Sequence, residues 1–194
     1  MYFKEGCTYH VYNRSNETLF YNRENYIFFI RKIRDHILPF ADVLAYCIMP
    51  NHFHLILTVK AEGVRFSEIK KREDMQLLPQ AIGTVLSSYT QALNKQRGRR
   101  GSVFAHKTKA KILNDAKDDY VLYCFMYVHQ NPKLSDLVEK IEDWEFSSFP
   151  EYIGKRNGTL VNIQMGLDVF QLEKSQIYGL TYKLLLDKFD EDFI

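Results

Sequence analysis

The chain has 194 residues, of which 46% are hydrophobic, 14% aromatic and 26% charged. This composition is that of a globular protein with enough apolar material for a core, so a largely disordered chain is excluded, and the length favours one domain. No apolar run approaches the roughly 18 residues of a membrane-spanning helix, and the polar start MYFKEGCTYH predicts no secretory signal.

The three cysteines, Cys7, Cys47 and Cys124, lie far apart in the sequence and form no CxxC pair. Regularly spaced cysteines would indicate a disulfide scaffold or a zinc ribbon, and neither pattern is present. The sequence therefore favours a reducing, cytoplasmic setting.

The net charge of +2 conceals an asymmetry between the two parts of the chain. Residues 1–135 carry 20 Lys and Arg against 12 Asp and Glu, whereas residues 136–194 carry 6 against 12. Between Met75 and Asn114 no acidic residue occurs, and the basic residues there are Lys95, Arg97, Arg99, Arg100, Lys107, Lys109 and Lys111. Charge alone fits a surface that binds a polyanion, and it fits a solvated basic loop equally well.

The N-terminal part predicts a strand, a helix and a hairpin in that order. Residues 8–14 alternate polar and apolar side chains and are rich in β-branched and aromatic types, which is typical of a strand. Residues 22–37 begin with an asparagine suited to capping and carry apolar residues at helical spacing. Residues 43–49 and 52–59 read as two strands joined by a tight Pro-Asn turn.

The middle of the chain predicts two more helices with a strand between them. Residues 79–96 read as a helix that starts near a proline, and a flexible basic turn follows. Residues 103–113 contain a strand candidate whose alternating lysines would share one face. Residues 115–130 predict a helix that must end at Asn131, because Pro132 follows.

The resulting order, β-α-β-β-α-β-α, favours an α+β sandwich with a mostly antiparallel sheet and helices packed on it. We expect residues 1–154 to form this domain and residues 155–194 to form a C-terminal tail. GKRNG at residues 154–158 has the composition of a linker. Helical candidates in the tail lie at residues 161–174 and 176–189.

His52, Phe53 and His54 form a His-hydrophobic-His motif in the second strand of the predicted hairpin. Because side chains alternate along a strand, the two histidines share one face, and Phe53 points the other way into apolar packing. Two imidazoles so placed can bind one divalent cation and leave positions for water or substrate oxygens. A pair of surface or hydrogen-bonded histidines is the commoner alternative.

Tyr127 and Asn131 are four residues apart near the end of a predicted helix and therefore share one face. A tyrosine hydroxyl can be a covalent nucleophile, and an amide oxygen can be a metal ligand. The alternatives are a structural Tyr127, as one of 13 tyrosines, and an Asn131 that merely stops the helix before Pro132. His129 would point about 160° away from Tyr127 on an ideal helix and is a secondary candidate. A two-histidine metal site, a helical tyrosine and a basic surface are together what metal-assisted cleavage of a DNA strand by tyrosine requires.

Four segments carry these residues: YHVYNRSN at 9–16, AYCIMPNHFHLIL at 45–57, SSYTQALNKQRGRRGSVF at 87–104 and YCFMYVHQNPKLSDLVEKIEDWEFSSFPEYIG at 123–154. In composition and order they resemble the single-tyrosine HUH transposases of bacterial insertion sequences. Within that group the chain is most similar to the branch called REP-associated tyrosine transposases. The resemblance extends over about residues 6–154, most of the chain.

The resemblance implies a ferredoxin-like sandwich whose central antiparallel sheet carries His52 and His54. These histidines would bind Mg²⁺ or Mn²⁺, with Asn131 at the position where related transposases use glutamine as the third ligand. Tyr127 would attack a phosphodiester of single-stranded DNA beside a hairpin, giving a 5′-phosphotyrosine link and a free 3′-hydroxyl. The residues expected to hold the DNA are Arg97, Arg99, Arg100, Lys107, Lys109 and Lys111. Relatives act as monomers or as homodimers that share their active sites, and both remain open.

Two other functions remain open beside DNA strand transfer. The first is a domesticated DNA-binding protein of the same fold without mobility. The second is a metal-dependent phosphoesterase that uses water, with Tyr127 merely structural. Tyr9, Tyr12 and Phe104 are candidates for stacking on DNA bases, with a core position as the alternative for each.

Overall fold

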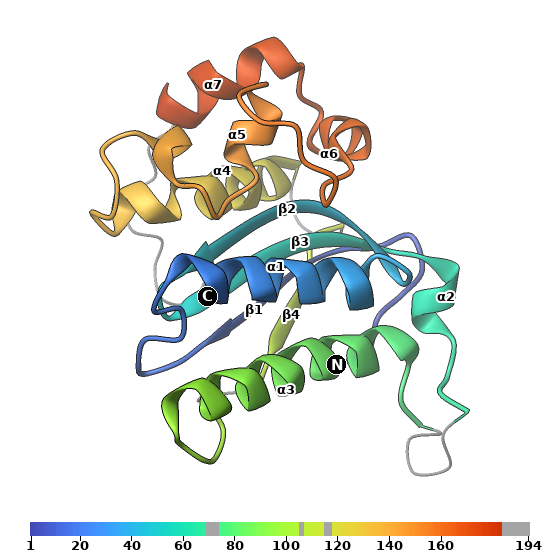
Figure 1. Cartoon of the computed structure of the whole chain (residues 1–194). Helices are drawn as coiled ribbons and strands as arrows, with labels where there is room; N and C mark the ends of the chain where they lie inside the picture. Colours follow the sequence, from blue (N-terminus) through green and yellow to red (C-terminus); the bar gives the residue numbers. More distant parts are fainter. Residues whose placement is uncertain (69–73, 105–106, 115–117, 184–194) are drawn as a thin grey trace.

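A four-stranded antiparallel sheet in the order β2-β3-β1-β4 forms the centre of the molecule (Figure 1). The computed structural model describes residues 1–68, 74–104, 107–114 and 118–183. The strands are β1 (Thr8–Arg14), β2 (Ala41–Met49), β3 (His52–Val59) and β4 (Lys109–Ile112). β3 pairs with β2 and β1, β1 also pairs with β4, and these pairings are all antiparallel.

Helices cover both faces of the sheet. α1 (Arg23–Ile37) and α3 (Leu77–Arg97) pack against each other on one face, and α4 (Asp118–Leu134) lies on the other (Figure 1). Because side chains alternate along a strand, Phe53 of β3 joins the core under α1 and α3, whereas Ile56 joins the core under α4. The sheet therefore separates two apolar cores.

Local signals set the ends of the two helices on the first face. The side chain of Asn22 accepts a hydrogen bond from the backbone N–H of Asn25 and caps α1. α3 ends at Gly98, whose φ of 61° lies in the left-handed region that glycine adopts without strain. Both ends lie where the sequence predicts them to within two residues.

The predicted α+β fold is confirmed. The element order β1-α1-β2-β3-α3-β4-α4 matches the prediction, with a short α2 (Ala61–Val64) inserted before α3. The strand order is that of a ferredoxin-like sandwich. β4 is shorter than the strand predicted over residues 103–113 and begins after Lys107, so Lys107 does not share a strand face with Lys109 and Lys111. Residues 105–106 of that prediction lie outside the described residues.

Helix α4 continues past the point where the sequence predicts its end. Pro132 lies inside the helix, so the expectation that it stops at Asn131 is wrong. Proline removes one backbone N–H from the helix and leaves a carbonyl short of a donor. The side-chain amide of Asn131 donates to the Tyr127 carbonyl oxygen at 3.1 Å, and the Ser135 N–H donates to the Asn131 carbonyl oxygen at 3.0 Å. The carbonyl that loses its helical donor is that of Val128, four residues before the proline, and neither bond reaches it. The Ser135 bond is an ordinary helical one, so regular helix bonding continues past Pro132.

Up to Lys183, where the described residues end, the C-terminal part contains four short elements that pack on or near α4 (Figure 1). They are η1 (Ile141–Asp143), α5 (Phe149–Tyr152), α6 (Ile163–Phe170) and α7 (Lys174–Lys183). α6 and α7 correspond to the two predicted tail helices, whereas η1 and α5 lie in a stretch with no predicted element.

Some predicted helix ends cannot be compared with the structure. Residues 115–117, where the α4 prediction begins, and residues 184–194, where the last prediction ends, lie outside the described residues. Within the described ranges, no helix combines the length and the apolar character that crossing a bilayer requires.

Candidate active site between the sheet and helix α4

His52 and His54 project from β3 toward α4, on one face as the motif predicts. Their ring centroids are 5.0 Å apart, with an interplanar angle of 85°. His54 is fully buried and His52 is partly accessible. Phe53, between them, is buried in the core on the opposite face. Because side chains alternate along β3, both imidazoles lie on the face of the sheet that is turned toward α4.

Helix α4 brings Tyr127 and Asn131 to the same two histidines. The Tyr127 ring lies edge to face against the His54 ring, with centroids 5.4 Å apart. Oδ1 of Asn131 lies 3.3 Å from Nε2 of His52. The histidine pair of β3 and the Tyr127–Asn131 pair of α4, which are far apart in the sequence, therefore lie next to each other in the fold.

Hydrogen bonds determine which atoms of His52 and Asn131 face each other. Nδ2 of Asn131 donates to the Tyr127 carbonyl oxygen, which turns its Oδ1 toward His52. Nδ1 of His52 lies 2.7 Å from Oδ1 of Asn51 and, as the donor in that bond, carries the single proton of a neutral imidazole. The lone pair on Nε2 of His52 then faces the oxygen of Asn131, and a cation between these two atoms would satisfy both.

The donor atoms at this point fit a divalent metal ion. Nε2 of His54 is buried and has no hydrogen-bond partner among the described residues. Together with Nε2 of His52 and Oδ1 of Asn131 it would supply two nitrogens and one oxygen to a cation, a set that leaves coordination positions open. Within the described ranges, no three His, Cys, Asp or Glu side chains form a metal-binding group, and the oxygen that would join the two histidines is that of the Asn131 amide. The residues present therefore fit the Mg²⁺ or Mn²⁺ that the resemblance implies.

Burial keeps these histidines neutral and the tyrosine protonated. It lowers the pKa of His52 to about 4, against an opposing effect of the Asn131 contact, and it lowers the pKa of His54 well below the usual value. Burial also raises the pKa of Tyr127 to about 12, which hydrogen bonding with Asn131 partly offsets. At neutral pH the imidazoles keep their lone pairs for a metal, and the phenol must lose its proton as it reacts.

The buried histidines predict an acid-sensitive metal-free protein. Burial lowers the pKa to about 3 for His10 and His129 and to about 4 for His52, whereas in the unfolded chain a histidine titrates near 6.5. Below that pH the unfolded state binds protons that the folded state excludes, so stability falls as the pH falls. We expect the free energy of unfolding to drop by about 1.4 kcal/mol per pH unit for each such histidine.

Urea unfolding at several pH values between 7 and 5, with a chelator present, measures this slope. His129 is a buried histidine that lies away from the two-histidine face, and His129→Gln removes its imidazole. In this variant the dependence of the free energy of unfolding on pH should be shallower by about 1.4 kcal/mol per pH unit, which corresponds to one proton. A wild-type slope below one proton per molecule in this range would contradict the prediction.

His10 of β1 is a third imidazole at this site and is itself buried, and the sequence motifs alone do not mark it. Its Nε2 lies 2.9 Å from Nδ1 of His54, and its ring stacks on Tyr12 with centroids 4.8 Å apart. The predicted strand over residues 8–14 already places His10 and Tyr12 on one face. The register that sets Tyr12 opposite His54 is a property of the β1–β3 pairing and has no signal in the sequence.

The three aromatic candidates for base stacking are all buried. Tyr9 and Phe104 belong to the core under α1 and α3, so for them the core alternative is the one observed. Tyr12 lies on the face of the sheet that carries His54, with ring centroids 6.0 Å apart.

Of the six candidate DNA-binding residues, Lys109 and Lys111 lie beside the site. Nζ of Lys109 is 5.6 Å from the centre of the Tyr12 ring, and Nζ of Lys111 is 4.8 Å from that of Tyr120. Lys107 is exposed and lines a cavity with residues of α3, away from this face. The structure therefore separates Lys107 from the other two lysines.

The remaining candidates, Arg97, Arg99 and Arg100, lie at the C-terminal end of α3. The Arg97 guanidinium lies 3.9 Å above the centre of the Tyr21 ring, and Arg99 donates two hydrogen bonds to the Glu17 carboxylate at 2.7 and 2.8 Å. Glu17 also lines a cavity of about 420 Å³ beside His52. The basic end of α3 thus reaches the rim of the site, with one of its charges already paired.

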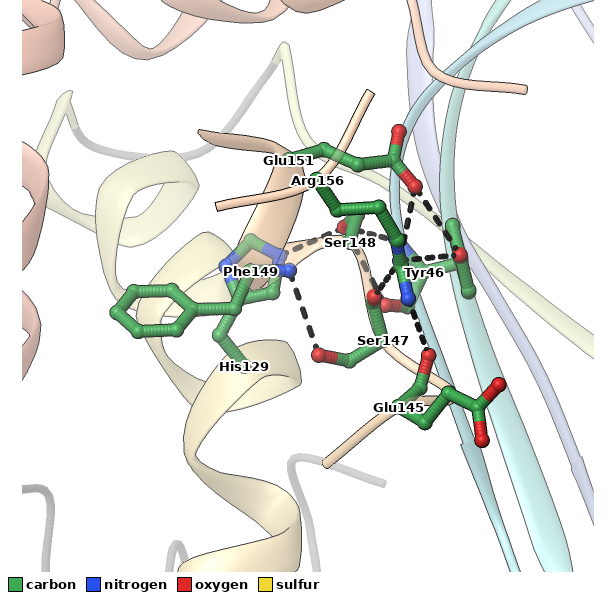
Figure 2. A network of polar contacts seen from close by, with 8 residues as sticks. All are labelled: Tyr46, His129, Glu145, Ser147, Ser148, Phe149, Glu151 and Arg156. Carbon is green, nitrogen blue, oxygen red and sulfur yellow. Dashed lines mark hydrogen bonds and ion pairs between the residues drawn. The ribbon is translucent and has the colours of Figure 1, made fainter. Parts of the chain in front are cut away.

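A polar network on the other side of α4 ties this helix to the sheet (Figure 2). Nε2 of the buried His129 lies 2.7 Å from Oγ of Ser148, and the same oxygen accepts the backbone N–H of Tyr46 in β2 at 2.9 Å. His129 packs against Phe149 and points away from Tyr127, as helix geometry predicts. His129 therefore anchors the helix that carries the tyrosine.

The WEFSS segment at residues 144–148 supplies the other half of this network. The N–H of Ile48 donates to the Phe146 carbonyl oxygen at 2.9 Å, so the segment runs beside β2. The Arg156 guanidinium donates to the Tyr46 hydroxyl and to the Glu151 carboxylate, both at 2.9 Å (Figure 2). This motif therefore supports the position of α4.

Comparisons with known proteins find a relative in sequence and a solved structure of the same fold. No family model matches the chain. A curated Haemophilus influenzae protein named as a REP-associated tyrosine transposase is 26% identical over 115 residues, which is 57% of this chain and 60% of that relative. The solved structure of a REP-associated tyrosine transposase bound to a REP hairpin superposes with a TM-score of 0.57 and 17% identity, over 84% of this chain and 92% of the other. A bacterial tRNA(His) guanylyltransferase-like protein in complex with GTP gives a TM-score of 0.45 at 9% identity, over 77% of this chain and 72% of the other.

The chain therefore shares its fold with the solved structure of a tyrosine transposase. More particularly, the resemblance to the REP-associated tyrosine transposases is confirmed in sequence by the first relative and in fold by the second. The match spans 60% of the length of the curated relative.

Proposed function

We propose that this protein is a metal-dependent DNA strand transferase that cleaves and rejoins single-stranded DNA through a 5′-phosphotyrosine intermediate. The observation that carries the proposal is the convergence of Tyr127 with the donor atoms of His52, His54 and Asn131. Its similarity to REP-associated tyrosine transposases supports it. Because the solved relative is bound to a REP hairpin, we propose a substrate with a hairpin near the cut.

In the proposed reaction, the phenol oxygen of Tyr127 attacks the scissile phosphorus, and the bond from phosphorus to the 3′ oxygen breaks. The products are a 5′-phosphotyrosine link and a free 3′-hydroxyl, and the proton lost by the phenol balances the proton gained by the departing oxygen. Attack of a 3′-hydroxyl on the phosphotyrosine reverses the step and rejoins a strand.

The chain's own residues position these groups. His52, His54 and Asn131 would hold Mg²⁺ or Mn²⁺, which when bound polarises the scissile phosphate and offsets the charge that develops on it. Helix α4 presents the Tyr127 oxygen at a fixed place, and His129 anchors this helix through Ser148. Such alignment makes the attack effectively intramolecular.

We further propose that one chain is sufficient for cleavage. The histidines come from β3 and the tyrosine from α4 of the same chain, and α4 packs on its own sheet. Residues 1–154 would then hold the whole site, while the tail of residues 155–194 supports α4 through α6 and α7. A homodimer is not needed to supply the tyrosine. For this activity we propose a cytoplasmic location.

Incubation with single-stranded DNA from the flanks of its own gene tests the proposal. The DNA should include a hairpin, and the reaction is run with and without Mn²⁺. A covalent protein–DNA adduct that survives denaturation and depends on the metal supports strand transfer. Cleavage without an adduct indicates the water-using phosphoesterase, and binding without cleavage indicates a domesticated DNA-binding protein.

The two lysines beside the site predict a salt-dependent affinity for DNA. We expect Lys109→Gln with Lys111→Gln to weaken binding of single-stranded DNA and to reduce the slope of log affinity against log salt by about 0.7 for each phosphate that the variant no longer neutralises. Titration of a labelled oligonucleotide at several salt concentrations measures the slope.

Two other sets of changes interpret this result. Lys140→Gln with Lys174→Gln removes the same charge from the exposed surface of the acidic C-terminal part and should leave the slope unchanged. A triple variant that neutralises Arg97, Arg99 and Arg100 measures how much the C-terminal end of α3 contributes to the DNA affinity and to its salt dependence. A double lysine variant with the wild-type slope would place the DNA elsewhere on the protein.

A further inference from the structure

A buried pair of imidazoles lies behind the proposed metal ligand His54. His10 is 1% exposed and His54 is fully buried. Nε2 of His10 and Nδ1 of His54 are 2.9 Å apart, and the two rings are inclined by 22° with centroids 5.1 Å apart. This distance is that of a hydrogen bond, so one of the two facing nitrogens carries a proton.

A neutral imidazole has one N–H and one lone pair, so only two proton arrangements are possible. In the first, Nδ1 of His54 donates to Nε2 of His10, and Nε2 of His54 is left with a lone pair. In the second, Nε2 of His10 donates, and His54 must then carry its proton on Nε2. That nitrogen is buried and has no acceptor among the described residues, and the same holds for Nδ1 of His10, which carries the proton in the first arrangement. Within the described ranges, each arrangement therefore leaves one buried N–H without an acceptor, and what distinguishes the two is the atom that His54 offers to a metal.

The two arrangements differ in what His54 offers to the site. The first turns a lone pair toward the site shared with His52 and Asn131, whereas the second presents an N–H that would repel a cation. A ligating histidine ordinarily donates its other N–H to an acceptor, which fixes the tautomer and the ring orientation. In this protein the acceptor in the right place is another histidine.

We propose that His10 is a positioning residue that accepts the N–H from Nδ1 of His54 and so holds His54 in the tautomer able to bind the metal. This inference rests on the proposed function, because the metal is the one assigned there. The β1–β3 register and the stacked Tyr12 ring hold His10 in place. A direct role in the reaction is not part of the proposal.

The tautomer of His54 is measured in the metal-free protein by long-range ¹⁵N–¹H NMR of histidine-labelled samples. We expect the wild-type His54 to be protonated on Nδ1. In His10→Phe, which keeps a buried ring but removes the acceptor, this single tautomer should be lost. A wild-type His54 protonated on Nε2 would overturn the proposal, and this measurement does not depend on whether any variant folds.

Mn²⁺ binding without DNA supplies the second readout. We expect the affinity of His10→Phe to fall by about 10- to 100-fold. His10→Gln, whose amide oxygen can accept the same N–H, should recover most of the loss. Thr8→Val removes a hydroxyl from the same strand face, where it contacts Thr58, and should bind Mn²⁺ as the wild type does. Wild-type affinity in a folded His10→Phe would overturn the proposal.

The two readouts separate this inference from the proposed function. Without Mn²⁺ binding by the wild type, the metal assignment fails, and the tautomer measurement still decides whether His10 orients His54. With normal Mn²⁺ binding but the other tautomer, the metal assignment stands and the role of His10 is refuted.

Discussion

Tyr127→Phe should abolish both the covalent adduct and the cleavage of single-stranded DNA. The change removes one hydroxyl from a ring that is 8% exposed and packed against His54, so the fold and the DNA affinity should persist. Without the phenol oxygen only water remains as a nucleophile, and we expect the cleavage rate to fall by at least about 10³-fold. Denaturing gels of a labelled hairpin oligonucleotide follow both products.

Two tyrosines of the same helix are the matched controls. Tyr120 lies under Lys111 and Tyr123 is partly exposed, and their Phe variants should keep the adduct. An adduct that persists in Tyr127→Phe and disappears in one of the other two would mean that the nucleophile lies one or two turns earlier on α4. Activity that survives in all three variants would refute the tyrosine mechanism and favour a water-using phosphoesterase.

His52→Ala should abolish cleavage with little effect on folding. His52 is partly accessible, and its loss removes one of two nitrogen donors from the proposed metal site. A metal that polarises a phosphate contributes several kcal/mol of charge stabilisation, so we expect the cleavage rate to fall by at least about 100-fold. Cleavage is measured in a defined Mn²⁺ buffer, with Mn²⁺ affinity measured in parallel.

Variants of the other two ligands test whether the site acts as a unit. His54→Ala should lose cleavage as completely, although its full burial also makes this variant less stable. Asn131→Ala should reduce cleavage less than His52→Ala, because both nitrogen donors remain. Wild-type rates in both His52→Ala and His54→Ala would show that these histidines do not hold the catalytic metal.

The position of the DNA bears on both predictions. Lys109 and Lys111 flank the face with His54 and Tyr127, whereas Arg99 is paired with Glu17 at the rim beside His52. Exposed ion pairs are weak, so a phosphate can compete with Glu17 for this arginine. The basic segment therefore approaches the site from two sides, and the two groups of cations can be tested separately.

Local sequence patterns were enough to predict the helices and strands, and to predict which functional residues share a face of the same helix or strand. Alternation over residues 52–59 put His52 and His54 on one strand face, and spacing on a helix put Tyr127 and Asn131 together. Each of these depends on the geometry of a single strand or helix, which a few neighbouring residues set. The same holds for the Asn22 cap and for the order of elements that predicts the fold.

Only the tertiary structure decided how those pairs meet. The contact of His52 with Asn131 joins residues 79 positions apart, and it follows from packing of α4 on the sheet. The place of His10 behind His54 depends on the β1–β3 register, and α4 continues past Pro132 although the local sequence signal predicts its end there. Register and packing are fixed by the sum of many weak contacts across the whole core, and no short stretch of sequence contains that sum.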